Sequence, residues 1–147
     1  MSFIPEPGGA MIRMCWIGTI IFVIAATVAT LDPDKLGWPG IIVSLVLFAV
    51  GAVAMLMAFF AAVERSRTQT IAVGGLYFGA GSTPRAVRWH LLGATAIQLA
   101  VGITTASIRP FTVVAFGTLV PVFGLGLMGL WTARHGEFPE REPDPKR

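Results

Sequence analysis

Charged and ionisable side chains are missing from the four long apolar stretches of this 147-residue sequence. No Asp, Glu, Lys, Arg or His occurs in residues 14–31, 41–63, 91–108 or 111–133. Proton- and ion-coupled carriers keep an ionisable residue inside the membrane, because that residue performs the coupling. Intramembrane hydrolases and transferases likewise need polar catalytic groups. The absence therefore argues against these classes, and we expect a protein that is not an enzyme.

Cysteine and charge are also scarce. Cys15 is the one cysteine of the sequence, which excludes an internal disulfide. Charged residues make up 13% of the chain, whereas about a quarter is usual in a soluble domain. The basic residues form no dense stripe with interleaved aromatics, so we expect no nucleic-acid partner. Residues 124–129 match GxGxxG but follow no strand, so they predict no dinucleotide cofactor.

The apolar stretches themselves predict an all-α, polytopic membrane protein with four transmembrane helices. We place the spans at about 14–31, 41–63, 88–108 and 111–133, within one transmembrane domain over residues 1–133. At 1.5 Å per residue, the second span reaches about 34 Å, which crosses a hydrocarbon core of about 30 Å with some tilt.

Proline and glycine mark the expected connections. We predict a loosely ordered arm over residues 1–12, a turn over 32–40, and a third helix that starts with Thr83 as N-cap and Pro84 at its first position. Pro121 predicts a kink in the fourth span.

Two segments outside the spans are less regular. Residues 68–82 are apolar and glycine-rich but too short to span, which leaves an interfacial and a re-entrant placement open. The charged, proline-rich residues 134–147 predict a disordered cytoplasmic tail.

Lysine and arginine are distributed unevenly across the predicted topology. Nine of them fall on the side of the two termini, and Lys35 and Arg109 fall on the other. Because basic residues concentrate in cytoplasmic segments, we expect both termini in the cytoplasm. Arginine outnumbers lysine nine to two, a bias typical of GC-rich bacteria, so we expect a bacterial inner (plasma) membrane. Trp16, Trp89 and Trp131 fall at cytoplasmic helix ends, where indole rings favour the headgroup level.

The third span carries the clearest polar face. Ala94, Gln98, Gly102 and Ala106 recur at intervals of four and therefore share one side of the helix. Small residues let helices approach closely, and a buried amide needs a partner. We interpret this face as a helix-packing surface, with a substrate-lining surface as the alternative.

Two further sets lie near the cytoplasmic interface. One consists of arginines that can contact anionic lipid headgroups, at about 1 kcal/mol each, or that serve only as topology signals. These residues are Arg65, Arg67, Arg85, Arg88 and Arg134. The other set is Cys15, His90 and His135, whose side chains are of the metal- and haem-ligating types. It contains no CxxC and no histidine pair at helical spacing, so we expect no metal and no cofactor.

Residues 130–139 (LWTARHGEFP), which follow a glycine-rich span, resemble small multi-pass membrane proteins of actinobacteria. The resemblance covers the last third of the chain and implies no activity.

The sequence as a whole favours a non-enzymatic accessory or scaffold subunit that packs against other membrane proteins or against itself, surrounded by membrane lipids. Two alternatives stay open. One is a small transporter or channel subunit whose path forms by oligomerisation and is lined by Gln98. The other is a redox-linked membrane anchor that uses His90 and His135.

Overall fold

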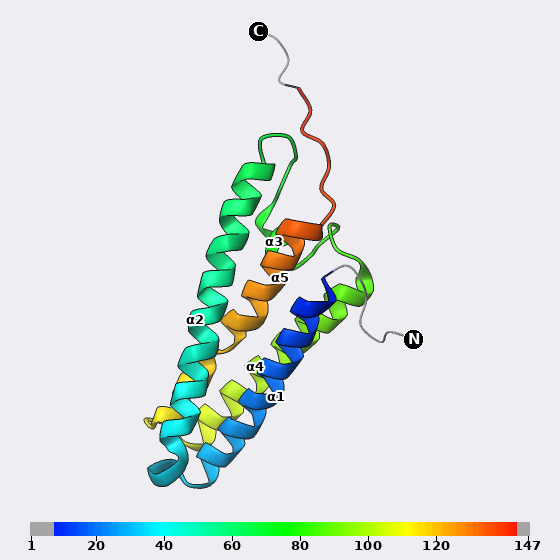
Figure 1. Ribbon diagram of the computed structural model, residues 1–147. Helices are drawn as coiled ribbons and strands as arrows, with labels where there is room; N and C mark the ends of the chain where they lie inside the picture. Colours follow the sequence, from blue (N-terminus) through cyan, green and yellow to red (C-terminus); the bar gives the residue numbers. More distant parts are fainter. Residues whose placement is uncertain (1–7, 144–147) are drawn as a thin grey trace.

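The computed structural model describes residues 8–143, and they fold into a bundle of helices (Figure 1). Four helical segments are long and apolar enough to cross a membrane, with mean hydropathies of 1.6 to 2.8. They are α1 (Gly9–Leu31), α2 (Pro33–Arg65), α4 (Arg85–Ile108) and the segment Val113–His135. No strand occurs within the described range, apart from an isolated bridge between Gln69 and Glu140. The predicted all-α, four-span fold is confirmed.

The last of these segments is not one regular helix. It consists of a 3-10 helix, η1 (Val113–Leu119), followed by α5 (Pro121–His135). Pro121 occupies the first turn of α5, where its missing N–H costs nothing. The kink predicted at Pro121 is therefore a boundary between two helices.

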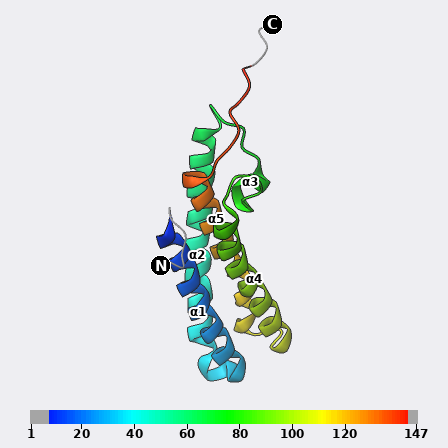
Figure 2. The ribbon, with the colours of Figure 1, turned by 90° about the vertical axis from the view of Figure 1, so that its right-hand side faces the viewer.

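Helix α5 lies at the centre of the bundle and is the most buried span. It packs against α2 and against α4, and α1 packs against the same two helices (Figures 1 and 2). A Cβ atom at Gly126 would overlap the carbonyl oxygen of Gly51, so α5 and α2 touch backbone to backbone. Small residues permit such contacts between membrane helices.

The connection between α1 and α2 differs from the predicted turn over residues 32–40. Asp32 alone separates the helices and caps α2, since its carboxylate accepts a hydrogen bond from the Lys35 N–H at 3.3 Å. Pro33 stands in the first turn and Pro39 inside the helix. Gly40 packs closely on Ala29 of α1, so the part of α2 that contains Pro39 lies against α1.

Helix α1 also begins earlier than expected. We predicted an arm over residues 1–12. Residues 1–7 lie outside the described range, whereas residues 9–12 belong to α1, which starts at Gly9. Ile12 and Cys15 are fully buried against the core that α2, α4 and α5 build. Burial of apolar side chains thus outweighs the low helix propensity of the glycines that precede them.

Helix α4 starts one residue later than predicted. Pro84 has the extended backbone of a cap residue, and Arg85 is the first helical position. The Thr83 hydroxyl does not cap the helix, because it lies 3.2 Å from the hydroxyl of Thr132 in α5. A contact between elements has replaced the local cap.

The central segment contains a short helix, α3 (Val73–Tyr77), which packs beside α5. The Tyr77 hydroxyl donates to the Met55 carbonyl at 3.1 Å. Met55 precedes the end of α2 by ten residues, which corresponds to about 15 Å along the helix axis. Burial raises the pKa of Tyr77. The segment therefore lies against the side of the bundle and does not cross it.

The predicted disordered tail differs from the structure over residues 136–143, and residues 144–147 lie outside the described range. The Thr70 N–H donates to the Pro139 carbonyl at 2.8 Å, and the Arg141 N–H donates to the Thr68 carbonyl at 2.9 Å. Backbone pairing with the segment after α2 gives the tail a fixed path, although its composition alone does not predict one.

Candidate functional site

Gln98 joins three helices at the centre of the bundle. Its amide nitrogen donates to the Thr19 hydroxyl of α1 at 2.7 Å, and its amide oxygen accepts from the Gly124 N–H of α5 at 3.2 Å. Thr19 in turn donates to the Cys15 carbonyl at 2.7 Å. Gln98 is 0% exposed. Both ends of the amide are thus used inside the protein, and one of them satisfies an N–H in the first turn of α5.

The predicted polar face of the third span is directed mainly into the bundle. Ala94 and Gly102 are buried, as Gln98 is, and Ala106 is half-buried. A Cβ atom at Gly102 would come within 2.7 Å of the Gly117 carbonyl oxygen of η1. These contacts show that the face packs inside the bundle. Because Gln98 is fully buried, the helices would have to rearrange before it could line a transport path.

The structure does not bring Cys15, His90 and His135 together as a ligand set. Cys15 is buried in the core. His90 accepts a hydrogen bond from the Trp16 indole at 3.2 Å, whereas the His135 ring contacts the Trp131 ring at a tilt, with 5.3 Å between the ring centres. Trp131 is 1% exposed, so its indole packs inside the protein core. Among residues 8–143, no group of three His, Cys, Asp or Glu is arranged to hold a metal ion.

Arg65 differs from the other arginines predicted to meet lipid headgroups. Its guanidinium donates to Gln69 and to the carbonyls of Ala133 and Gly136, at 2.9 to 3.0 Å. It also lies 5.0 Å from the centre of the Phe138 ring. Arg65 therefore holds the end of α5 and the start of the tail, and its three nitrogens are occupied by protein groups.

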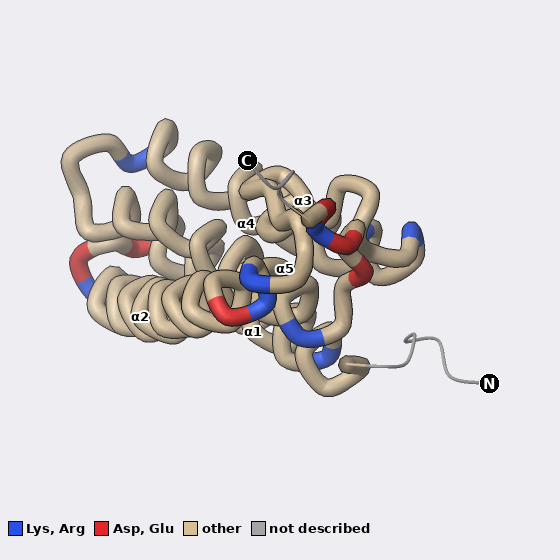
Figure 3. Tube along the Cα trace, turned by 90° about the horizontal axis from the view of Figure 1, so that it is seen from above, with Lys and Arg blue, Asp and Glu red and all other residues tan. Residues whose placement is uncertain are grey.

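The remaining arginines, Arg67, Arg85, Arg88 and Arg134, are exposed at the same end of the bundle. The four apolar stretches carry no charge, so the charged residues lie at the ends of the helices and in the connections. Figure 3 shows them from above. This end is therefore suited to contacts with anionic groups.

The outward side of α4 carries a second series of small residues, which sequence reasoning missed. We call it the α4 stripe and define it as Ala96, Ala100, Thr104 and Ser107, all of which are exposed. Their spacing, of four residues up to Thr104 and three to Ser107, was visible in the sequence. The sequence did not predict which of the two small-residue faces of α4 is buried; the structure shows that the face with Gln98 is the inward one.

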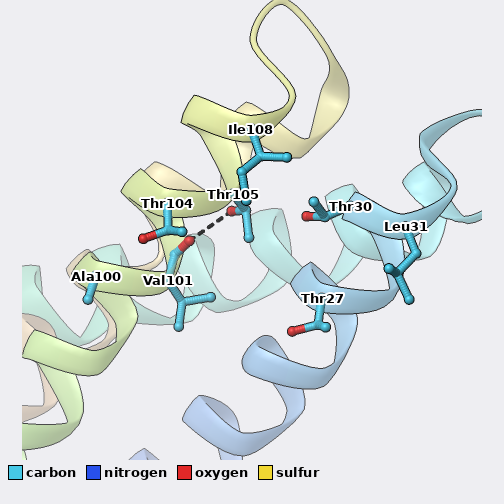
Figure 4. Close-up of a pocket in the computed structure, with 8 residues that line it drawn as sticks. All are labelled: Thr27, Thr30, Leu31, Ala100, Val101, Thr104, Thr105 and Ile108. Atoms are coloured by element: carbon cyan, nitrogen blue, oxygen red, sulfur yellow. Dashed lines mark hydrogen bonds between the residues drawn. The ribbon is translucent and has the colours of Figure 1, made fainter.

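A hollow of about 440 Å³ borders the α4 stripe at the end away from the chain termini. It lies between α1 and α4, and its lining residues are drawn in Figure 4: Thr27, Thr30, Leu31, Ala100, Val101, Thr104, Thr105 and Ile108. The hydroxyls of Thr27, Thr30 and Thr105 donate to carbonyls of their own helices at 2.7 to 2.8 Å. These threonines thus present methyl groups, together with satisfied oxygens, to the hollow.

Thr104 is the exception in this hollow. Its hydroxyl is exposed and makes no hydrogen bond with any residue that the structure describes. Ser107, one turn further on, donates to the Ile103 carbonyl at 2.7 Å. An unsatisfied hydroxyl on a membrane-spanning helix favours a hydrogen bond to a neighbouring helix. The α4 stripe therefore offers both a close approach and a free polar group.

The arrangement supplies packing surfaces and hydrogen-bonding groups, and none of the residue sets described above forms a nucleophile–base pair. Comparison with known proteins adds no family: no family model, no curated protein and no solved structure matches this chain.

Proposed function

We propose that this protein is a non-enzymatic accessory or scaffold subunit of the membrane, and that the α4 stripe binds a transmembrane helix of another membrane protein. The observation that carries the proposal is the free Thr104 hydroxyl within a row of small exposed side chains. Elsewhere the outward surface of the spans is mostly large and apolar, as at Ile24, Val53 and Phe60, which suits contact with acyl chains.

Binding at the stripe follows from the size of its side chains. Ala96 and Ala100 let a partner backbone come close, so that van der Waals contact and weak Cα–H···O bonds accumulate along the crossing. Thr104 then donates to a carbonyl of the partner helix. An interhelical hydrogen bond of this kind contributes about 0.6–2 kcal/mol.

Affinity purification from native membranes tests the proposal. We expect wild-type protein to carry a membrane protein in fixed ratio, and Ala100→Leu to lose it because the larger side chain keeps the helices apart. The matched control is Ala49→Leu, the same enlargement at an exposed position of α2. Retention of the same partner by Ala100→Leu would contradict the proposal.

Folding of each variant is checked with the single cysteine. Cys15 is buried, so a maleimide labels it only when the bundle opens. If wild-type protein instead comes out alone as a symmetric oligomer that Ala100→Leu dissociates, the stripe binds a second copy and the accessory role is rejected.

We also propose that the end carrying the tail and α3 faces the cytoplasm of a bacterial cell. The excess of basic residues at this end supports the assignment. In a Cys15→Ala background, Leu36→Cys should react with an impermeant thiol reagent from outside intact cells, and Thr68→Cys should not. The reverse pattern would invert the topology.

A further inference from the structure

A second hollow, of about 600 Å³, opens beside the start of α4. We call it the arginine hollow. Its lining combines two arginines, a tryptophan and an apolar floor: Gly79, Gly81, Thr83, Arg85, Arg88, Trp89, Leu92, Gly93 and Ala96. It lies at the end of the bundle where the tail and α3 lie. Its charged residues, Arg85 and Arg88, are therefore next to the apolar, membrane-spanning part of α4.

The two arginines are not neutralised by the protein. Arg88 donates through Nε to the Phe78 carbonyl at 2.8 Å, which fixes its side chain against the loop and leaves the outer nitrogens of the guanidinium for a ligand. The Arg85 side chain makes no hydrogen bond or ion pair with any residue between 8 and 143, and the lining contains no carboxylate. Glu137 is tied to the loop before α4 only through its backbone, since its N–H donates to the Ser82 carbonyl, and the residue is exposed.

The loop before α4 keeps the hollow open. Gly79 and Gly81 have φ values of +63° and +73°, a region that favours glycine. A Cβ atom at Gly79 would overlap the end of Met128, which shows how closely this part of the loop lies on the bundle. Nothing lies within 4 Å of a Cβ placed at Gly81, so the mouth of the hollow is unobstructed there.

The floor of the hollow is apolar and runs along α4 toward the α4 stripe. Leu92 and Gly93 follow Arg88 by about one turn and Arg85 by about two. A Cβ atom built on Gly93 meets nothing within 4 Å. Trp89 is 68% exposed beside them, as expected of an indole at the headgroup level. The hollow thus has arginines at the end of the bundle and apolar residues toward its middle, as a phospholipid has a polar headgroup followed by acyl chains.

We propose that the arginine hollow binds an anionic phospholipid, with Arg85 and Arg88 on its phosphate and the start of one acyl chain along Leu92 and Gly93. Guanidinium groups match phosphate oxygens with paired N–H donors. Basic pockets at the cytoplasmic ends of membrane helices hold such headgroups. The inference does not depend on the accessory role, because the lipid contacts assigned to Arg85, Arg88, Leu92 and Gly93 involve none of the α4 stripe residues, although Ala96 borders both surfaces.

Lipid retention in native mass spectrometry tests the proposal on the full chain. Protein is loaded in nanodiscs of phosphatidylcholine with phosphatidylglycerol and then released. We expect wild-type protein to retain phosphatidylglycerol, and Arg85→Gln/Arg88→Gln to lose about tenfold or more of the binding. The control, Arg67→Gln/Arg134→Gln, removes two exposed charges at the same end that do not line the hollow. Solvent and salt screen such charges, so retention should stay within about twofold of wild type.

Two further measurements separate this site from general electrostatics and from free phosphate. Gly93→Leu keeps both arginines but fills the floor, so it should weaken retention of phosphatidylglycerol. Equal losses in the two arginine double variants, or no loss in Arg85→Gln/Arg88→Gln, would overturn the site. Inorganic phosphate that displaces the lipid at equal concentration would assign the hollow to a soluble anion instead.

Discussion

Gln98 connects α1, α4 and α5 through polar side-chain groups that are buried from solvent. Its partners are the Thr19 hydroxyl and the Gly124 N–H, and both lie inside the bundle. A donor or acceptor left unpaired in such a place costs the full desolvation of that group. Gln98 is therefore expected to stabilise one arrangement of the three helices.

Replacing Gln98 by Leu should lower stability by about 1–2 kcal/mol, since the Gly124 N–H and the Thr19 hydroxyl both lose a partner. Labelling of Cys15 in increasing denaturant measures the change. Thr104→Val is the control, because its hydroxyl has no bond within the described residues and the isolated protein should be indifferent to its loss. Equal curves for Gln98→Leu and wild type would show that the amide contributes nothing.

At the scale of elements, α5 depends on glycines for its central position. The Gly126–Gly51 contact brings two backbones together, whereas Gly93 faces open space. Gly126→Ala should therefore destabilise the protein by about 1–3 kcal/mol through overpacking. Gly93→Ala should be neutral or slightly stabilising, since alanine is the better helix former.

Thermal unfolding followed by Cys15 labelling compares the two glycine variants. Equal melting temperatures for Gly126→Ala and Gly93→Ala would mean that α5 and α2 do not touch as closely as the structure has them.

Arg65 links the end of α2 to the end of α5 and to the tail. Arg65→Gln should release residues 136–143, because the bonds to Ala133 and Gly136 and the contact with Phe138 disappear together. Amide hydrogen exchange in the tail should then rise, with little change within α1. Arg67→Gln, which removes an exposed charge two residues away, should leave exchange as in wild type. An unchanged tail in Arg65→Gln would contradict this role.

The elements also show which parts of the fold the sequence could predict. Four uncharged stretches suffice for four spans, because a helix is the structure that satisfies its own backbone in lipid. Boundaries were less predictable. Pro39 lies inside α2 and Thr83 does not cap α4, since contacts with α1 and α5 outweigh the local signals.

The candidate site was only partly visible in the sequence. Gln98 stood out as the one amide in an apolar span, but its partners come from segments 79 and 26 residues away. The α4 stripe has no amide that marks it as Gln98 marks the inward face. Thr104 becomes distinctive only when neighbouring hydroxyls are seen to donate to carbonyls of their own helices. Backbone pairing of the tail likewise depends on where α5 ends.

At the scale of the whole molecule, the interior and the outward surface have separate roles. The interior uses glycine, alanine and one amide to hold α5 between α2 and α4. The outward surface is apolar around most of the bundle, with the α4 stripe and the arginine hollow meeting at Ala96. We infer that α4 is the helix through which the protein meets its surroundings specifically.

Photo-crosslinking in native membranes tests this central claim most directly. A photoreactive amino acid replaces Ile103, a large exposed residue beside the stripe, in one variant and Val53 in another, and adducts are resolved by mass after illumination. Neither change enlarges a small residue of the α4 stripe. We predict a discrete protein adduct at position 103 and lipid adducts alone at position 53. No protein adduct at 103, or the same protein adduct at both positions, would contradict a specific role for α4.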